Sequence, residues 1–203
     1  KIKCIELNVS GAFHSPLMKF AREVLSNAIN VLYFNDANVP IYQNINAEPA
    51  RNASTIKKNL INPNLIKDMD KATDTTISHM KSKNIIGIFG DYDVDGATST
   101  ALLTRYFALL KVRTKIYIPN RKTEGYGPNI EGFNKLIELG AKVIFTVDCG
   151  TLSFEPIVKA QNQNTDVIVL DHHQSDLKIP KACAVVNPNR YDDTSKLNYL
   201  CAA

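Results

Sequence analysis

Hydrophobic residues from about position 63 onward form short continuous runs, and amphipathic stretches lie between these runs. The runs have the length of strands and fall at residues 84–89, 115–118, 142–147, 166–170 and 184–186. Apolar positions at helical spacing fill the intervals at residues 97–110, 130–139 and 155–161. Continuous apolar strands that alternate with helices are typical of a parallel sheet buried on both faces. The pattern therefore predicts an α/β fold, with helices on both faces of a parallel sheet and function at the carboxyl ends of its strands.

Residues 1–61 follow a different pattern. After a mixed, strand-like start, Pro16 precedes apolar positions at helical spacing between residues 17 and 29, and proline suits the first turn of a helix. A short strand is expected at Val39–Tyr42, and residues 44–66 then become polar and rich in asparagine. This change predicts a domain boundary. We therefore expect a small α/β amino-terminal fragment at residues 1–61 and a second domain at residues 62–203.

Composition narrows the class of protein. With 44% hydrophobic and 22% charged residues among 203, the chain has ordinary globular values, which exclude a wholly disordered, collagen-like or disulfide-scaffold protein. No apolar run approaches the roughly 20 residues of a membrane-spanning helix, and the start lacks the features of a signal peptide. We therefore expect a cytoplasmic protein without a membrane partner. The net charge of +4 permits a polyanionic partner but is too small to demonstrate one.

The four cysteines are scattered and form no CxxC pair, which argues against a structural zinc site and predicts reduced thiols; they are Cys4, Cys149, Cys183 and Cys201. Cys149 follows Asp148, but no histidine lies near it in sequence. We expect it to be a small buried residue rather than a nucleophile.

Acidic and imidazole side chains follow three of the expected strands. They are Asp91, Asp93, Asp95, Asp148, Asp171, His172 and His173. The carboxyl ends of parallel strands share one edge of a sheet, and five carboxylates gathered there would repel one another without cations. Mixed carboxylate and imidazole ligands favour manganese or magnesium. Two such ions about 3.5–4 Å apart can generate a hydroxide and stabilise both oxygens of a phosphoryl displacement, so the motifs predict phosphoester hydrolysis.

Each motif has a plainer explanation when it is taken alone. DxDxDG also begins calcium loops, although Leu102 stands at the twelfth position, where such a loop needs a glutamate. Aspartates after strands often cap helices, and Asp148 before a glycine is typical of a turn. The adjacent histidines could be surface residues. The three motifs together favour a metal centre over these alternatives.

The stretches IFGDYDVDGATSTALL, RKTEGYGPN, TVDCGT, VIVLDHHQ, AVVNPNR and LCAA resemble the RecJ-like single-stranded DNA exonucleases of the DHH phosphoesterase superfamily. The resemblance covers about residues 62–203. It implies a DHH domain with two manganese or magnesium ions that hydrolyses single-stranded DNA from its 5′ end, in DNA repair and recombination. It also implies that the family's fourth motif, its DHHA1 domain and its OB-type domain would lie beyond Ala203, so that activity of this chain is expected to be incomplete.

The same resemblance assigns roles to residues. It implies that the catalytic residues are Asp93, Asp95, Asp148, His172 and His173. The metal ligands it implies are Asp91, Asp93, Asp95, Asp148, Asp171 and His172. A closely related alternative is a DHH phosphoesterase for short oligonucleotides or cyclic dinucleotides, and another is an inactive fused fragment.

Two further stretches are candidates for substrate binding. In the first, Arg121, Tyr126 and Gly127 belong to a glycine-rich loop in which a basic residue and an aromatic ring could hold a phosphate and stack a base. The alternative is that this loop is simply a good turn sequence. In the second, Asn189 and Arg190 follow the last expected strand, where they would either contact a phosphate or form a surface turn.

The amino-terminal stretches NVSGAFHSPLMKFA and VPIYQNINAEP resemble the carboxyl-terminal part of malonyl-CoA:acyl carrier protein transacylases, with His14 at the position of the catalytic histidine. Those enzymes need a serine in a GHSxG elbow, which His14 would activate, and this chain contains no such motif. We therefore expect His14 to be a remnant, and neither acyl carrier protein nor malonyl-CoA to be a partner.

Overall fold

The computed structural model describes residues 35–42, 49–58, 65–198 and 200. His14, the helix expected between residues 17 and 29, Cys4 and Cys201 lie outside the described residues. None of the helices in the described part of the chain has both the length and the apolar character of a membrane span.

The large unit is built on a parallel sheet. Its strands are β3 (Ile85–Gly90), β4 (Thr114–Tyr117), β5 (Ala141–Val147), β6 (Asp166–Leu170) and β7 (Ala184–Val186). Their spatial order is β4-β3-β5-β6-β7, and every neighbouring pair is parallel. The predicted α/β fold is confirmed. The chain runs outward from β3 to β4 and then returns to the other side of β3 as β5, which creates a topological switch point between β3 and β5.

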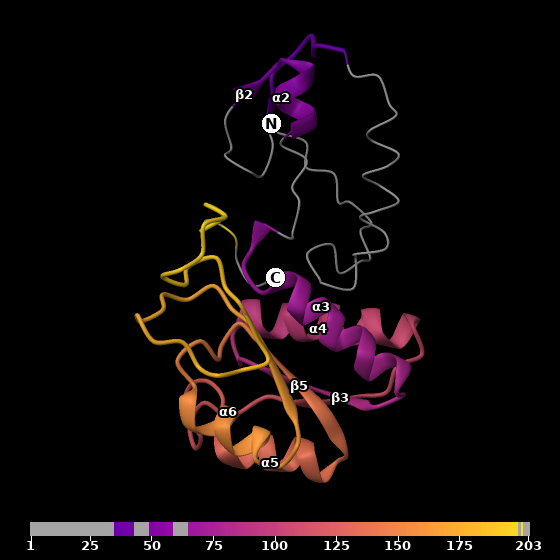
Figure 1. Ribbon diagram of the computed structural model, residues 1–203, viewed down its shortest axis with the longest axis vertical. Helices are drawn as coiled ribbons and strands as arrows, with labels where there is room; N and C mark the ends of the chain where they lie inside the picture. The colour runs from indigo at the N-terminus through magenta and orange to yellow at the C-terminus, as the bar shows by residue number, and fades with distance from the viewer. Residues whose placement is uncertain (1–34, 43–48, 59–64, 199, 201–203) are drawn as a thin grey trace.

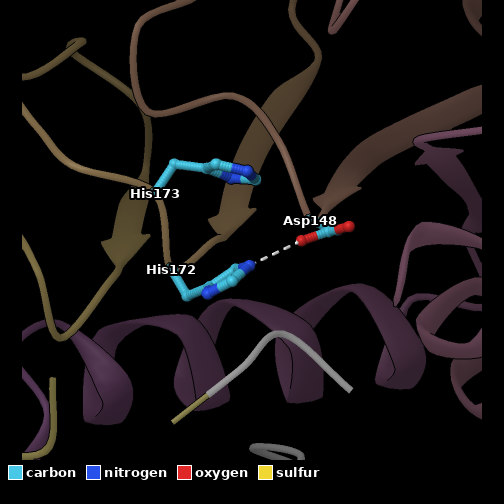
Figure 2. Close-up of side chains that lie close together, drawn as sticks. All are labelled: Asp148, His172 and His173. Carbon is cyan, nitrogen blue, oxygen red and sulfur yellow. Dashed lines mark ion pairs between the residues drawn. The ribbon is translucent and has the colours of Figure 1, made fainter. Parts of the chain in front are cut away.

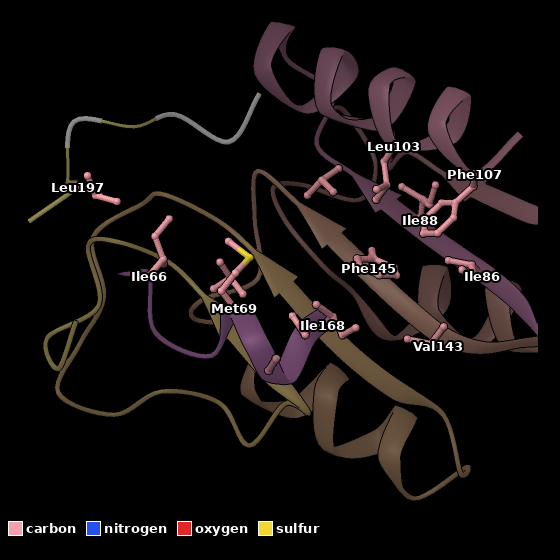
Figure 3. Packing of buried hydrophobic residues seen from close by; sticks show 14 residues of the cluster. Ile66, Met69, Ile86, Ile88, Leu103, Phe107, Val143, Phe145, Ile168 and Leu197 are labelled. Atoms are coloured by element: carbon pink, nitrogen blue, oxygen red, sulfur yellow. The ribbon is translucent and has the colours of Figure 1, made fainter. Parts of the chain in front are cut away.

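Helices cover both faces of this sheet (Figure 1). One face carries α3 (Met69–Lys81) and α4 (Val94–Leu109), and the other carries α5 (Ile130–Glu138) and α6 (Phe154–Gln161). Successive side chains of a strand point to opposite faces of the sheet. Ile86 and Ile88 of β3 pack under α4, whereas Phe89 packs with α5. Figure 3 shows the first of these layers, in which Leu103 and Phe107 of α4 lie over β3 and β5. Because both faces are buried, the strands lack polar alternation.

A small unit lies near the amino-terminal end of the described chain. It contains the antiparallel pair β1 (Ile41–Tyr42) and β2 (Pro49–Ala50), followed by α2 (Ala53–Lys58). The strand predicted at Val39–Tyr42 is confirmed over its last two residues. Part of the asparagine-rich boundary is helical, because Asn52 Oδ1 accepts hydrogen bonds from the amides of Ser54 and Thr55 and so caps α2.

Candidate metal centre

The three acidic turns meet at the carboxyl end of the sheet, next to the switch point between β3 and β5. The first acidic residue of each turn extends the hydrogen bonding of its strand. The amide of Asp91 donates to Val147 O, that of Asp148 to Leu170 O and that of Asp171 to Val186 O. Each carboxylate is therefore fixed through its backbone to the neighbouring strand, which explains why residues far apart in sequence are held in register.

The first turn connects β3 to α4, and Asp93 is the residue that caps α4. Its side chain accepts a hydrogen bond of 2.9 Å from the amide of Gly96, and this bond is the main cause that lowers the pKa of Asp93. The cap also explains why α4 begins at Val94, earlier than the predicted residue 97. A Cβ atom at Gly96 would lie 2.6 Å from Asp91 Cβ, so glycine permits the close approach of helix and turn.

Asp91 lies beneath this helix start, and its side chain is almost completely buried. Burial is the main cause that raises its pKa, and the negative charge of Asp93 raises it further. Both the helix-cap interpretation and the metal interpretation apply to this turn, because the capping residue also belongs to the acidic cluster.

The second turn follows β5, and Asp148 adopts the left-handed conformation there, with φ of 61°. A non-glycine residue in this conformation is uncommon and is often found at functional sites. Its side chain is only 1% exposed, and burial followed by the nearby carboxylate of Asp93 raises the pKa of Asp148 to about 7. Oδ1 of Asp148 lies 3.1 Å from Nε2 of His172, as Figure 2 shows.

The third turn follows β6, and Asp171 organises it. Its Oδ1 accepts hydrogen bonds from the amide of His172 and from Nδ1 of His173, and its Oδ2 accepts one from the amide of Thr151. Burial raises the pKa of Asp171, but the bonds from Thr151 and His173 outweigh burial and hold it below the ordinary value. Nδ1 of His173 donates to Asp171, so in the neutral ring Nε2 keeps a lone pair for another partner.

Two groups of side chains share Asp148. One consists of Asp91, Asp93 and Asp148, and the other of Asp148, His172 and His173; within each group the ligand atoms lie within 4.8 Å of one another. Figure 2 shows both rings of the second group on the same side of Asp148.

The donor atoms of this cluster fit a hard divalent cation. Oδ1 of Asp91 and both carboxylate oxygens of Asp148 are buried and make no hydrogen bond within the described part of the chain. Unpaired buried carboxylate oxygens are costly unless a proton or a cation neutralises them. Carboxylates with imidazole, and no thiolate among them, suit manganese or magnesium.

Two of the expected ligands stand outside both groups. Asp95 is half-buried in the first turn of α4, and its negative charge is one of the smaller causes that raise the pKa of Asp148. Asp171 directs its oxygens to Thr151, His172 and His173 instead. The structure thus brings together Asp91, Asp93, Asp148, His172 and His173, and it places Asp171 as the support of the histidine pair.

The glycine-rich loop lies beside the cluster. The hydroxyl of Tyr126 donates to Asp148 O over 3.4 Å, and its ring packs edge-on against that of His173, with 5.8 Å between centroids. Arg121 lies over the ring of Tyr92, 5.3 Å from its centroid. Gly127 has φ of 78°, a conformation that glycine adopts without strain. The loop is therefore placed next to the candidate metal ligands.

In the turn after β7, the side chains of Asn189 and Arg190 are used for contacts within the chain. The side chain of Arg190 is 3% exposed, and its guanidinium pairs with Asp68 at 2.7 Å and with Asp192 at 2.6 Å. Asn189 donates its side-chain amide to the carbonyl of His172. A phosphate contact by Arg190 does not fit this geometry, because carboxylates of its own chain already occupy the guanidinium.

An open cavity of about 840 Å³ lies next to His173. Tyr126 and Gly127 line one side, and Thr151 and Phe154 line another. It is large enough for a nucleotide unit, with aromatic and small polar groups in its wall.

Sequence reasoning assigned no role to Thr151 or Asn187, although both are buried next to the third turn. Thr151 follows the Asp-Cys-Gly turn directly and Asn187 follows β7, so the available sequence signal was a polar residue close after an apolar strand. The expectation for Cys149 is confirmed, since its side chain is buried in the core.

Comparison with known proteins decides the family. The sequence profile described as DHH family, N-terminal domain, matches residues 85–202, which is more than half of the chain. The chain belongs to the DHH family. This DHH chain is 36% identical over 125 residues to the single-stranded-DNA-specific exonuclease RecJ of Bacillus subtilis, and 36% identical over 133 residues to that of Haemophilus influenzae. These alignments cover 62% and 65% of the chain.

Solved structures resemble the DHH chain in the same region. A crystal structure of exonuclease RecJ bound to manganese superposes with a TM-score of 0.59 at 28% identity, and covers 66% of this chain and 36% of that one. RecJ from Thermus thermophilus in complex with Mn²⁺ gives a TM-score of 0.50 at 25% identity, and covers 62% of this chain and 18% of that one. The chain spans only 16% and 23% of the length of the Bacillus and Haemophilus relatives.

Proposed function

We propose that this chain hydrolyses phosphodiester bonds of single-stranded DNA with manganese or magnesium ions bound at Asp148. The observation that carries the proposal is the set of buried carboxylate oxygens of Asp91 and Asp148 that have no hydrogen-bond partner within the described residues. A cation between the two groups that share Asp148 would satisfy those oxygens. It would also offset the burial and the nearby charge of Asp93, which together raise the pKa of Asp148.

The metal ligands we propose are Asp91, Asp93, Asp148, His172 and His173, with Asp95 close enough to add negative charge. When bound there, two divalent ions supply an activated water and stabilise the charge of a phosphoryl displacement. The protein's own part is to hold these ligands. Asp171 keeps the Nδ1 proton of His173 in place, and the backbone hydrogen bonds of the three turns keep the carboxylates in register.

Single-stranded DNA is the proposed substrate, and attack from its 5′ end is the proposed polarity. Relatives at 36% identity are named single-stranded-DNA-specific exonucleases, which supports this choice. Tyr126 is 56% exposed beside the cluster, and an exposed aromatic residue suits an unpaired base. Arg121, which lies over the ring of Tyr92 and whose positive charge acts on Asp91, is a candidate phosphate contact. Short oligonucleotides are the alternative substrate, and the test below separates the two.

The test compares a long single strand, a duplex of the same sequence and a dinucleotide, each carrying a 5′ label, in the presence of Mn²⁺. We expect release of nucleotides from the single strand, loss of activity with EDTA, and no activity in Asp148→Ala. Asp70→Asn, an exposed carboxylate on α3, serves as the matched control and should act like the wild type. Cleavage of the dinucleotide alone would show that short oligonucleotides, and not long single strands, are the substrate. Activity that survives Asp148→Ala would refute the proposal that the metal ions bind at Asp148.

A role in DNA repair and recombination in the cytoplasm is part of the same proposal. A 5′ exonuclease on single strands would process the broken or unwound ends that such reactions produce. The names of the relatives support the substrate on which this role depends.

For residues 1–61 we propose descent from the carboxyl-terminal part of a malonyl-CoA:acyl carrier protein transacylase. The sequence around His14 supports this origin. The chain has no GHSxG serine for His14 to activate, so the proposal includes no acyl transfer. Incubation with malonyl-CoA should leave the chain unmodified, and an acylated chain detected by mass spectrometry would refute the statement that the remnant transfers no acyl group.

A further inference from the structure

The turn after β7 holds the backbone of the histidine pair. Asn187, at the end of β7, is completely buried, and its side-chain amide donates to His173 O over 2.9 Å and to Thr151 Oγ1 over 2.8 Å. Asn189 donates its own side-chain amide to His172 O. The carbonyls of both histidines therefore accept hydrogen bonds from one short turn.

This turn is itself fixed at both ends. Asn187 Oδ1 accepts the amide of Asn189 over 2.7 Å, which locks the two asparagines together. Arg190 then anchors the turn, because its buried guanidinium donates to Val185 O and pairs with Asp68, which precedes α3. The turn is thus tied to the sheet and to a helix outside the metal centre.

The same contacts continue to the carboxylate that orients His173. Thr151 accepts from Asn187 and donates its amide to Asp171 Oδ2, and Asp171 Oδ1 receives Nδ1 of His173. The backbone and the ring of His173 are consequently held through one connected network. His172 is held through its carbonyl by Asn189, while its Nε2 faces Asp148 at 3.1 Å.

We propose that Asn187 and Asn189 are positioning residues that aim the imidazoles of His172 and His173 at Asp148, and that they do not contact the substrate. This inference rests on the proposed function for its metal and deepens it. A donor used for a backbone carbonyl is not available to a phosphate, and polar groups behind metal-binding histidines set the orientation of the rings.

The test uses Asn189→Ala, because Asn189 is only partly buried and its loss leaves the core intact. Asn162→Ala, at an exposed asparagine after α6, is the matched control. The first readout needs no metal: nitrogen NMR of the histidine rings in the metal-free chain should show shifted resonances of His172 in Asn189→Ala and unchanged ones in Asn162→Ala. The second readout is Mn²⁺ affinity, which should fall about ten- to hundredfold in Asn189→Ala.

Kinetics on single-stranded DNA separates positioning from substrate contact. Positioning predicts a lower kcat with KM within about twofold of the wild type, since ring orientation affects the chemical step. Wild-type imidazole resonances and Mn²⁺ affinity in Asn189→Ala, with a raised KM, would overturn the proposal in favour of a substrate contact. Asn187→Ala should shift the resonances of His173, and if it fails to fold, Asn189→Ala still decides. If the wild type binds Mn²⁺ but leaves DNA intact, the proposed function fails while the NMR and affinity comparisons still test the positioning.

Discussion

Oδ1 of Asp148 lies 3.1 Å from Nε2 of His172, although the two residues belong to turns after different strands. The contact is possible because β5 and β6 are parallel neighbours, so their carboxyl ends lie side by side. Asp148 makes no well-directed hydrogen bond with this ring, and both of its oxygens stay without a hydrogen-bond partner among the described residues. A buried carboxylate held beside an imidazole in this way can bind one cation together with that imidazole.

Asp148→Asn should stabilise the metal-free chain and remove its response to Mn²⁺. The substitution deletes a buried charge next to Asp93, so we expect a gain of about 1 kcal/mol or more, or about 2–4 °C in melting temperature. The wild type should gain about 2.7 kcal/mol from Mn²⁺ at a hundred times Kd, and Asp148→Asn should gain almost nothing. Thermal unfolding in EDTA and in Mn²⁺ measures both. Asp70→Asn should match the wild type in each solution, and an equal Mn²⁺ gain in Asp148→Asn would speak against the site.

The contribution of Asp148 to the stability of the metal-free chain should fall as pH rises from about 4 to about 7. Folding raises the pKa of Asp148 from 3.8 to about 7, so in this window the folded chain keeps a proton that the unfolded chain has lost. The contribution of this group falls by at most about 1.4 kcal/mol per pH unit. Urea unfolding in EDTA across this range measures the slope. The difference between Asp148→Asn and the wild type should widen with pH, and a constant difference would mean that Asp148 titrates normally.

The fold was predictable from sequence to a large extent, because strands buried on both faces leave a clear apolar run. Residues 166–170 and 184–186 were predicted as strands with their observed bounds. The start of α4 was misplaced, since its first residues carry the acidic motif and their helical state depends on the cap by Asp93. The helical part of the asparagine-rich boundary was missed for a similar reason, because Asn52 acts as a cap.

The sequence motifs predicted which residues the structure brings together at the candidate site, but not which role each of them has. Asp171 and Asp148 both follow a buried strand, and only the three-dimensional contacts show that Asp171 is used for hydrogen bonds while Asp148 is left unpaired. Arg190 was expected either to contact a phosphate or to lie in a surface turn, and its burial against Asp68 depends on a partner far away in the chain. Such long-range pairings leave no local sequence signal.

Gly96→Ala should disturb the first turn without adding charge. The new Cβ would lie 2.6 Å from Asp91 Cβ and from the carbonyl oxygen of Asp91, so helix and turn must separate. We expect a loss of about 1–3 kcal/mol in the free energy of unfolding and weaker Mn²⁺ binding. Ala101→Ser, at an exposed position of the same helix, controls for changes in α4. Calorimetry in the presence and absence of Mn²⁺ gives both quantities, and wild-type Mn²⁺ affinity in Gly96→Ala would show that the turn tolerates the displacement.

Arg190→Ala and Arg121→Ala should act on different properties. Removing Arg190 takes a buried guanidinium away from Asp68 and Asp192, which should cost about 1–3 kcal/mol of stability. The cost stays in this range because Asp192 keeps its pair with Lys67 and Asp68 keeps the amide of Val185. Arg121→Ala should leave the melting temperature nearly unchanged, weaken binding to single-stranded DNA and reduce the salt dependence of binding by about 0.7 in the logarithmic slope. Unfolding and fluorescence titration with labelled DNA distinguish the two variants. If Arg190→Ala were as stable as the wild type but bound DNA more weakly, the result would support a phosphate contact by Arg190, which the geometry disfavours.

Anomalous diffraction from crystals of this chain grown with Mn²⁺ locates the ions by element. We expect anomalous peaks in contact with the Asp148 carboxylate, one within ligand distance of Asp91 or Asp93 and one within ligand distance of His172 or His173. Crystals that show Mn²⁺ elsewhere on the chain and none at Asp148 would contradict the assignment of these turns as a metal centre.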